Sequence, residues 1–356
     1  MELAETYRGR KVMITGDTGF KGSWLVTWLL HHGAEVVGYA LPPKAATENY
    51  VVCDLATKIT HVDGDVCDHA RFAAVVEDHR PEILFHLAAQ ALVLESYASP
   101  RETFATNVMG TINLLEAVRR APSVKAVVVA SSDKCYLGQA GHAAYRETDT
   151  LGGLDPYSAS KAAAEIAVAA MRHSFFQGSA TAAIATARAG NVIGAGDWAH
   201  HRIVPDCIRS LQRGESITVR NPTAVRPWQH VLDALHGYLQ LGARLLADGE
   251  RYVGGWNFGP TQTAHVSVVQ LVEAVIAAWG SGSHSARVDA NARAEAVVLA
   301  LDSSKARTQL GWSPVAELVR AVAWTVDGYR AELADPAAVF DHRVAQIREF
   351  ERLARG

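Results

Sequence analysis

The most constraining feature of the chain is a glycine-rich turn near its N-terminus, between a strand and a helix. Residues 11–15 form a short apolar segment typical of a buried strand, and they run directly into Gly16-Asp17-Thr18-Gly19-Phe20-Lys21-Gly22. Residues 23–30 then follow a helical pattern. Glycines let a backbone approach a pyrophosphate, and the first turn of a helix offers it free N–H groups. The order predicts a dinucleotide-binding loop, although the spacing is G-x-x-G-x-x-G rather than G-x-G-x-x-G.

Apolar segments typical of buried strands recur along the first half of the chain and alternate with helical patterns. Besides residues 11–15, they lie at 35–39, 59–62, 83–87, 126–130 and 182–187. Strands that alternate with helices pair in parallel, because a crossover helix returns the chain to the same end of the sheet. The pattern therefore predicts an α/β protein built on a doubly wound, parallel Rossmann sheet.

The composition changes after residue 188 to glycine-rich loops with Arg, Trp and Asn. We expect residues 1–187, together with about 229–257, to form the dinucleotide-binding domain. Residues 188–228 and 258–356 are expected to form a smaller α/β C-terminal lobe that binds the substrate. Guanidinium groups bind phosphates through paired hydrogen bonds, and indoles offer stacking surfaces, so these loops suit a nucleotide diphosphate. Surface loops with interface salt bridges are the alternative for any single Arg.

Polar residues directly follow the strand predicted at 126–130. Ser132, Asp133 and Lys134 stand at its carboxyl end, the edge where open α/β sheets bind their ligands. Further on, Asp155-Pro156 indicates a helix start, since Asp can cap a helix and Pro fits its first position.

The helix that starts there carries Tyr157 and Lys161, four residues apart and therefore one turn apart on the same face. A Lys ammonium beside a phenol stabilises the phenolate, so Tyr157 becomes a usable proton acceptor near neutral pH. A solvated helix face is the alternative for this pair alone. The buried strand that delivers Ser132 to the same region favours catalysis.

Candidate cofactor contacts lie at the ends of other predicted strands. After 35–39 the chain reads Ala40-Leu41-Pro42-Pro43-Lys44, without the acid that binds the ribose of NAD or the Arg that accepts the extra phosphate of NADP. Asp65, next to Val66, could hold the adenine amino group, or it could be a turn or N-cap residue. The small residues of Leu87-Ala88-Ala89 could let the backbone come close to the nicotinamide.

Composition restricts the class of partner. The net charge of −3 gives no sign of a nucleic-acid partner, and no apolar run is long enough for a membrane span. The four cysteines form no C-x-x-C pattern, which indicates free thiols in a reducing compartment. The N-terminus lacks the apolar region of a signal peptide, so we expect a cytoplasmic protein. The 15 His residues are not in metal-ligand spacing, so we expect no bound metal.

Further motifs complete a family pattern that runs almost end to end. They are Phe85-His86-Leu87-Ala88-Ala89-Gln90, Ser96-Tyr97, residues 102–111, Ser132-Asp133-Lys134-Cys135-Tyr136, residues 188–194 with Gly196-Asp197-Trp198, residues 226–231, Leu301-Asp302 and Leu310-Gly311-Trp312. With the glycine turn and Tyr157-x-x-x-Lys161 they resemble the extended short-chain dehydrogenase/reductase family of nucleotide-sugar enzymes. Asp-Lys after Ser132 resembles the CDP-glucose 4,6-dehydratase subgroup; dTDP-glucose dehydratases carry Asp-Glu there, and 4-epimerases have no such acid–base pair.

The resemblance implies dehydration of a nucleotide-activated glucose, CDP-D-glucose to CDP-4-dehydro-6-deoxy-D-glucose, with NAD as cofactor and NADP left open by the sequence. Tyr157 would take the proton of the sugar 4-hydroxyl, to which Ser132 hydrogen-bonds, while hydride leaves C4 for the nicotinamide. Lys134 would stand where the family's base or proton relay acts at C5. Asp133 would protonate the departing C6 hydroxyl, which requires a raised pKa, whereas Lys134 as a base would need a lowered pKa.

The resemblance also implies three sets of residues and an assembly. The catalytic residues would be Ser132, Asp133, Lys134, Tyr157 and Lys161. The cofactor would contact Gly16, Thr18, Gly19, Phe20, Lys21, Gly22, Asp65, Val66, Leu87, Ala88, Ala89, Asn107, Tyr157 and Lys161. The nucleotide sugar would contact Gln90, Asn191, Arg202, Arg220, Arg226 and His230. By analogy, helices around 107–120 and 156–172 would pair across a two-fold axis in a homodimer or homotetramer.

Four positions depart from the family pattern. Asp17 replaces a His, Ala91 replaces a Pro, Leu94 replaces an Arg, and Ala294 replaces a His. These changes leave open whether the sugar nucleotide is CDP-glucose or another one. Two alternatives to a dehydratase are a nucleotide-sugar 4-epimerase, which the acid–base pair after Ser132 disfavours, and a non-catalytic dinucleotide-binding regulator, which the intact catalytic residues disfavour.

Overall fold

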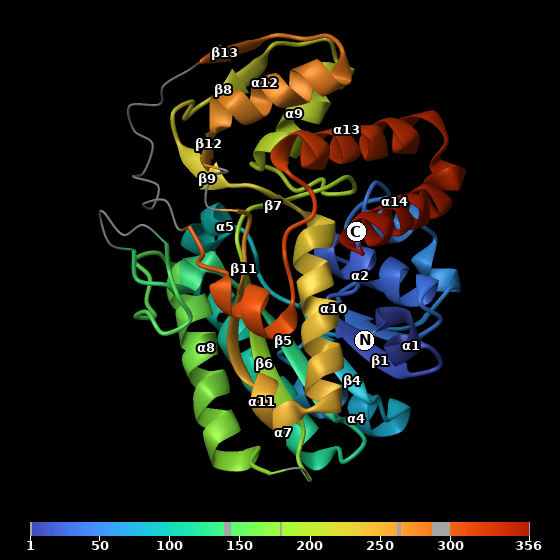
Figure 1. Ribbon diagram of the computed structural model, residues 1–356, viewed down its shortest axis with the longest axis vertical. Helices are drawn as coiled ribbons and strands as arrows, with labels where there is room; N and C mark the ends of the chain where they lie inside the picture. The colour runs from blue at the N-terminus through green and yellow to red at the C-terminus, as the bar shows by residue number, and fades with distance from the viewer. Residues whose placement is uncertain (1, 139–143, 179, 262–264, 287–299, 356) are drawn as a thin grey trace.

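The computed structural model describes residues 2–138, 144–178, 180–261, 265–286 and 300–355. Its centre is a parallel sheet of seven strands in the order β11-β6-β5-β4-β1-β2-β3 (Figure 1). The strands are β1 (Lys11–Thr15), β2 (Glu35–Ala40), β3 (Thr60–Asp63), β4 (Ile83–His86), β5 (Ala126–Ser132), β6 (Ala183–Ala189) and β11 (Gly254–Phe258). The strand order reverses between β1 and β4, so the predicted doubly wound α/β sheet is confirmed.

The sheet has one strand more than the six predicted. The cluster Trp256-Asn257-Phe258 is one of the Trp- and Asn-containing segments after residue 188 for which the composition predicts a loop, but β11 pairs with β6 along its whole length and forms an edge of the sheet. All three side chains are fully buried. The polar Asn257 between two aromatic residues hid the strand, because only the tertiary structure supplies the partners that let an amide be buried.

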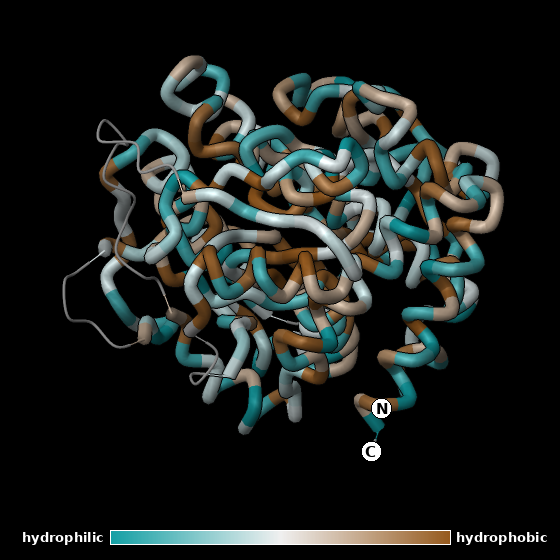
Figure 2. The backbone as a smooth tube through the Cα atoms, turned by 90° about the horizontal axis from the view of Figure 1, so that it is seen from above, coloured by the Kyte–Doolittle hydropathy of each residue, from teal (hydrophilic) through white to brown (hydrophobic). Residues whose placement is uncertain are grey.

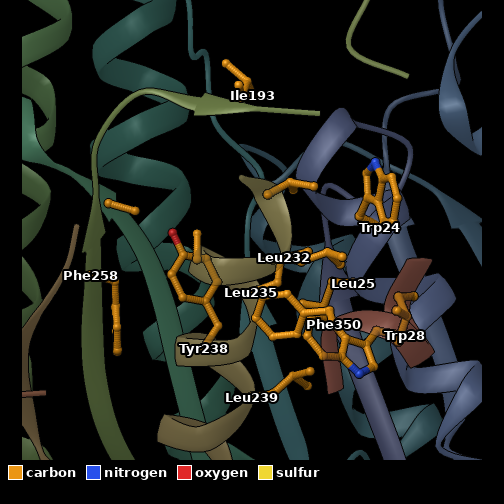
Figure 3. Close-up of a cluster of buried hydrophobic side chains, with 14 of the residues drawn as sticks. Trp24, Leu25, Trp28, Ile193, Leu232, Leu235, Tyr238, Leu239, Phe258 and Phe350 are labelled. Carbon is orange, nitrogen blue, oxygen red and sulfur yellow. The ribbon is translucent and has the colours of Figure 1, made fainter. Parts of the chain in front are cut away.

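Helices cover both faces of the sheet. One face carries α1 (Leu3–Tyr7), α2 (Phe20–His31) and α10 (Val231–Ala247), with α14 (Val339–Ala354) packed on α2, and the other carries α4 (His69–His79), α7 (Gly110–Arg120) and α8 (Pro156–Phe175). On the first face Trp28 of α2 packs edge-on against Phe350 of α14, with ring centres 5.4 Å apart, and Trp24 of α2 belongs to the same buried cluster as Leu235 and Tyr238 of α10 (Figure 3). The C-terminal helix α14 therefore completes the core around the helix that follows the glycine turn, and the two chain ends lie on the same side of the molecule (Figures 1 and 2).

Smaller elements gather beyond the carboxyl ends of the strands, in the upper part of Figure 1. Three two-stranded sheets pair β7 (Val192–Ile193) with β10 (Gln229–His230), β8 (Ile217–Val219) with β13 (His284–Ala286), and β9 (Val225–Pro227) with β12 (His265–Ser267). The helices there are α9 (Ile203–Gln212), α12 (Val268–Trp279) and α13 (Leu318–Ala334). The division into two domains at residues 187, 229 and 257 stays a prediction.

The remaining described elements are short. They are α3 (Asn49–Val52), η1 (Leu55–Thr57), α5 (Val93–Ala98), α6 (Pro100–Phe104), η2 (Ala105–Met109), η3 (Asp133–Cys135), α11 (Gly249–Tyr252), η4 (Ala306–Leu310) and η5 (Pro336–Ala338). The helical spacing of apolar residues over 101–121 predicts one long helix, but the structure has α6 and α7 joined by the π-helical turn η2, which holds Asn107. Among the described helices, none is both long and apolar enough to cross a membrane.

Candidate functional site

The glycine turn closes where the ends of β1 and β4 meet. Gly16 has a φ of +76°, and a Cβ on it would lie 2.6 Å from the backbone nitrogen of Ala88. A Cβ on Gly22 would overlap the carbonyl oxygen of Gly16. Thr18 ties the turn to the end of β2 by donating a 3.0 Å hydrogen bond to the carbonyl of Leu41. The backbone is therefore bare at the start of α2, which fits a pyrophosphate group.

Two side chains of the turn reach beyond it. The ring of Phe20 packs against Gly194, where a Cβ would lie 3.1 Å from the ring. The Lys21 ammonium stands 5.9 Å from the ring centre of the buried Tyr238. Burial, with the nearby cations Arg202 and Lys161, lowers the pKa of Lys21 to about 8. Lys21 thus points from the cofactor turn toward the group of charges around the predicted catalytic residues.

Asp17 points under the turn rather than toward a phosphate. Its side chain is fully buried against Gly38 of β2, and Oδ2 lies 2.7 Å from Nδ1 of His61. Burial raises the pKa of Asp17, and the hydrogen bond from His61 opposes that rise. His61 therefore accommodates the departure at position 17. Leu94 is 53% exposed on α5, and Ala294 lies outside the described residues.

Asp65 is a turn residue, which was the alternative to binding the adenine amino group. Its Oδ1 accepts a 2.8 Å hydrogen bond from the backbone nitrogen of Cys67, while Asp68 caps α4. Val66 packs against Gly110 of α7, where a Cβ would lie 2.7 Å from it. Contact of Asp65 and Val66 with adenine stays a prediction.

Asn107 joins the end of β4 to α8. Its Oδ1 accepts a 2.9 Å hydrogen bond from the Gln90 nitrogen, and its Nδ2 donates to the Gln90 carbonyl at 3.0 Å and to Ser160 Oγ at 2.8 Å. The Gln90 side chain is itself engaged, since its Nε2 donates to Thr103 Oγ1 at 2.9 Å. Asn107 thus fixes the loop from Leu87 to Gln90 against the helix that bears the Tyr-Lys pair.

The residues after β5 form the short helix η3. Ser132 Oγ donates a 3.0 Å hydrogen bond to Asp133 Oδ1 and accepts one of 3.2 Å from the Lys134 nitrogen. Asp133 is only 4% exposed. Burial raises the pKa of Asp133, and the charges of Lys134 and Lys21 oppose the rise. The direction is the one that an acid with a proton to donate requires.

Helix α8 begins as predicted, with the Asp155 carboxylate accepting a 2.9 Å hydrogen bond from the Ser158 nitrogen. Burial raises the pKa of Tyr157 to about 12, while a hydrogen bond with Ser132 and the charge of Arg202 lower it. The Lys161 ammonium instead donates to the carbonyl of Ala130 at 3.4 Å, and burial lowers its pKa to about 8. The expected lowering of the Tyr157 pKa by Lys161 is therefore wrong: burial raises that pKa overall, and Ser132 and Arg202 only partly oppose the rise.

The predicted substrate residues lie in the loops beyond the sheet. Arg202 pairs with Asp197 at 2.8 Å, and Arg220 lies 3.5 Å from Nδ1 of His201. Arg226 donates to the carbonyl of Val225 at 2.8 Å. The backbone carbonyl of Asn191 accepts a 3.0 Å hydrogen bond from the nitrogen of Gln229, which joins β7 to β10.

His230 and the indoles of these loops face inward. His230 is fully buried beside Trp24 and Trp324, and its Nδ1 caps α10 by accepting a 3.3 Å hydrogen bond from Leu232. Burial lowers its pKa to about 3. Stacking of a base on an indole of these loops stays a prediction. Trp228 and Trp256 are buried, and Trp198 donates to Glu332 at 2.8 Å.

The sequence analysis named Arg188 and Tyr136 only within family motifs, and it did not single out Glu165. Glu165, one turn beyond Lys161, pairs with Arg188 of β6 at 2.7 Å, and Arg188 also donates to the hydroxyl of Tyr136. The available signals were the four-residue step from Lys161 and a lone Arg in an apolar strand.

Comparison with known proteins extends the match to nearly the whole chain. Residues 13–324 match the family model of GDP-mannose 4,6 dehydratase. A CDP-glucose 4,6-dehydratase of Salmonella typhimurium is 43% identical over 312 residues, 86% of this chain and 87% of the relative. The resemblance predicted from the sequence motifs is confirmed.

Two solved structures share the fold. A UDP-glucose 4-epimerase from Stenotrophomonas maltophila with bound NAD and formylated UDP-arabinopyranose has a TM-score of 0.78 and 25% identity, covering 91% of this chain and 99% of its own. A dTDP-glucose 4,6-dehydratase from Bacillus anthracis in complex with NAD has a TM-score of 0.76 and 21% identity, covering 90% and 97%. The chain therefore belongs to the GDP-mannose 4,6-dehydratase family of the extended short-chain dehydrogenases/reductases.

Proposed function

We propose that the protein is an NAD-dependent hydro-lyase that converts CDP-D-glucose into CDP-4-dehydro-6-deoxy-D-glucose. The observation that carries the proposal is the buried Asp133, which accepts a hydrogen bond from Ser132 and lies close enough to Tyr157 for its charge to act on the Tyr157 pKa. An acid with a raised pKa can expel a hydroxyl group as water, a step that epimerisation at C4 does not need. The 43% identity with a CDP-glucose 4,6-dehydratase supports CDP as the nucleotide.

NAD fits the bare turn of Gly16, Gly19 and Gly22, and Thr18, Phe20 and Lys21 complete its binding loop. When bound, NAD supplies the oxidant for the sugar C4 position and the reductant for C6. Asp65 with Val66, the segment Leu87–Ala89, Asn107, Tyr157 and Lys161 are proposed as its further contacts. Structures of relatives with bound NAD support this cofactor.

The chain's own residues handle the protons. Tyr157 takes the proton of the 4-hydroxyl, and Ser132, hydrogen-bonded to Tyr157, orients that hydroxyl. Lys134 accepts or relays the C5 proton, which the 4-keto group has made acidic. Asp133 then gives its proton to the leaving C6 hydroxyl. Burial at 4% exposure keeps water from competing for that proton.

The nucleotide sugar is proposed to lie between the strand ends and the loops that carry Asn191, Arg202, Arg220 and Arg226. Arg202 is the best placed of these, because its charge acts on Tyr157. Gln90 and His230 belong to the same proposed set, although their side chains already hold Thr103 and cap α10, respectively.

We also propose a homodimer or homotetramer in the cytoplasm. Met109 and Ile166 are exposed apolar side chains on the helical segments expected to pair across a two-fold axis. All four cysteines are free, which supports a reducing compartment.

The test is incubation of the protein with NAD and CDP-, dTDP-, GDP- or UDP-glucose, followed by alkali and detection of the ultraviolet absorbance of a 4-keto-6-deoxy sugar. CDP-glucose should give the fastest signal, and another nucleotide sugar in first place would reassign the substrate. No signal with any of the four would rule out a dehydratase. Conversion of UDP-glucose to its 4-epimer without loss of water would favour the epimerase alternative.

A further inference from the structure

The two halves of the candidate site stand on different elements. Asp133 and Lys134 lie on η3 after β5, whereas Tyr157 and Lys161 lie on α8. Behind both lies Arg188 of β6, which is only 4% exposed. A charged side chain this deep is costly unless its hydrogen bonds are well made, so its partners define what it does.

One side of the Arg188 guanidinium holds the helix. Nε lies 2.9 Å from Glu165 Oε1 and Nη2 lies 2.7 Å from Oε2, a two-pronged contact that fixes direction as well as distance. Thr186 Oγ1 donates a further 2.8 Å hydrogen bond to Oε2. Burial alone would lower the pKa of Arg188, but Glu165 raises it above the usual value. Glu165 lies one helical turn beyond Lys161 and two beyond Tyr157.

The other side of the Arg188 guanidinium binds Tyr136, next to the turn that carries Asp133 and Lys134. Nη1 donates to the hydroxyl of Tyr136 at 2.7 Å and to the carbonyl of Glu147 at 3.2 Å, and the guanidinium lies 5.0 Å from the centre of the Tyr136 ring. Tyr136 directly follows η3 in the chain. Its hydroxyl in turn donates a 2.7 Å hydrogen bond to Asn257 Oδ1 on β11. The turn is thus anchored to the same guanidinium that anchors the helix.

We propose that Arg188 is a positioning residue, which sets the Asp133–Lys134 turn against the Tyr157–Lys161 helix so that both reach one sugar. The proposal rests on the dehydratase activity proposed above. The reaction uses the helix first and the turn second, so the distance between them matters chiefly for the second stage. A misplacement of about 1 Å can slow a step by about 10²-fold.

The test separates the two stages in Arg188→Met and Tyr136→Phe. Reduced nicotinamide absorbance follows the first stage, and the alkali-developed absorbance of the keto sugar follows the whole reaction. Tyr136→Phe removes the hydrogen bond from Arg188 to the turn, together with the bond from Tyr136 to Asn257, and leaves the Glu165 contacts in place. We expect both variants to form product about tenfold to a hundredfold more slowly, while reduced cofactor accumulates. The balance of the stages is the rate of cofactor reduction relative to the rate of keto-sugar formation. Arg188→Lys should be more stable than Arg188→Met without a wild-type balance of the stages, because an ammonium cannot make the two-pronged contact.

The matched control is Arg343→Met on α14, which removes another fully buried guanidinium, 3.2 Å from Glu332. It should lower the melting temperature and leave the balance of the two stages unchanged. Folded Tyr136→Phe with a wild-type balance would overturn the proposal, and so would an equal shift of the balance in Arg343→Met. Tyr136→Phe decides alone if Arg188→Met does not fold. If wild-type protein makes no keto sugar, both the proposed function and the positioning role of Arg188 are rejected.

Discussion

Gly190 lies against the carboxyl group of Asp133: a Cβ on Gly190 would stand 3.0 Å from Asp133 Oδ2 and 3.4 Å from Pro227 Cγ. Asp133 is held by Ser132, and Pro227 lies in the β9–β12 pair, so neither neighbour can give way freely. Gly190→Ala should displace the carboxyl group and slow dehydration by about tenfold. The loss of stability should stay near 1 kcal/mol, because one methyl group is added. Steady-state rates and thermal unfolding measure the two effects.

The control for Gly190 is Gly259→Ala. A Cβ there would be equally crowded, 3.1 Å from the Leu301 side chain, but it has no contact with Asp133. Gly259→Ala should lower the free energy of unfolding by a similar amount and leave the rate of dehydration nearly unchanged. Equal rates for the two variants would contradict the steric role of Gly190.

The proposed acid and base should fail at different stages. Tyr157→Phe removes the group that takes the 4-hydroxyl proton, so cofactor reduction should fall by about 10²-fold or more. Asp133→Asn should leave the rate of cofactor reduction unchanged and slow the loss of water, because an amide cannot donate the proton. Single-turnover absorbance of reduced nicotinamide, compared with release of keto sugar, separates the stages. The reverse order of effects would reject the assigned roles.

Affinity for NAD should weaken as the pH rises through about 8. Burial and neighbouring cations lower the pKa of Lys21 to about 8, so its charge is present below that pH and lost above it. The charged ammonium attracts the pyrophosphate, so the dissociation constant should rise several-fold between pH about 7 and about 9.5. Calorimetric titration with NAD measures it. Lys21→Met should bind weakly and nearly independently of pH, and a wild-type pH profile in that variant would assign the effect to Lys161, whose pKa is also about 8.

The exposed apolar residues of the helical segments around α8 should mediate self-association. Met109 is 50% exposed on η2 and Ile166 is 57% exposed on α8. Met109→Asp and Ile166→Asp should each convert the assembly to monomers, because a charge cannot be buried there without a partner. Light scattering after size-exclusion chromatography gives the mass. Leu333→Asp, equally exposed on α13, is the control, and a monomeric wild type would contradict the prediction.

The C-terminal helix should loosen on acidification. Glu351 of α14 accepts hydrogen bonds from Trp28 at 2.8 Å and His32 at 2.5 Å. Burial alone would raise the pKa of Glu351, but the hydrogen bonds from His31, His32 and Trp28 more than offset it, so the net pKa is lowered. A lowered acid pKa gives stability that is present above the unfolded value and is lost as pH falls through the folded one.

Glu351→Gln should therefore cost about 2 kcal/mol near neutral pH and less in acid. Chemical denaturation at several pH values measures the free energy of unfolding. Glu349→Gln, an exposed neighbour on the same helix, should change little at any pH. An equal loss from Glu351→Gln at all pH values would show that the carboxylate charge is not what matters.

Local patterns predicted most of the fold and missed what depends on distant partners. Six of the seven central strands were found, because each is an apolar run between helical patterns. The seventh was missed because Asn257 breaks its pattern, and its amide is satisfied by the carbonyl groups of Tyr145 and Asp302, more than forty residues away. The single helix over 101–121 hid the π-helical turn that places Asn107.

The sequence by itself determined the chemistry of the site: the glycine turn after the first strand, Ser132 with Asp133 and Lys134 at a strand end, and Tyr157 with Lys161 one helical turn apart. These are local spacings, and helix and strand geometry fixes what they present. Only the tertiary structure decided the electrostatics. It buried Asp133, turned Lys161 toward Ala130, and brought Arg188 between Tyr136 and Glu165. Burial and charge pairing depend on segments far apart in the chain, so no local pattern encodes them.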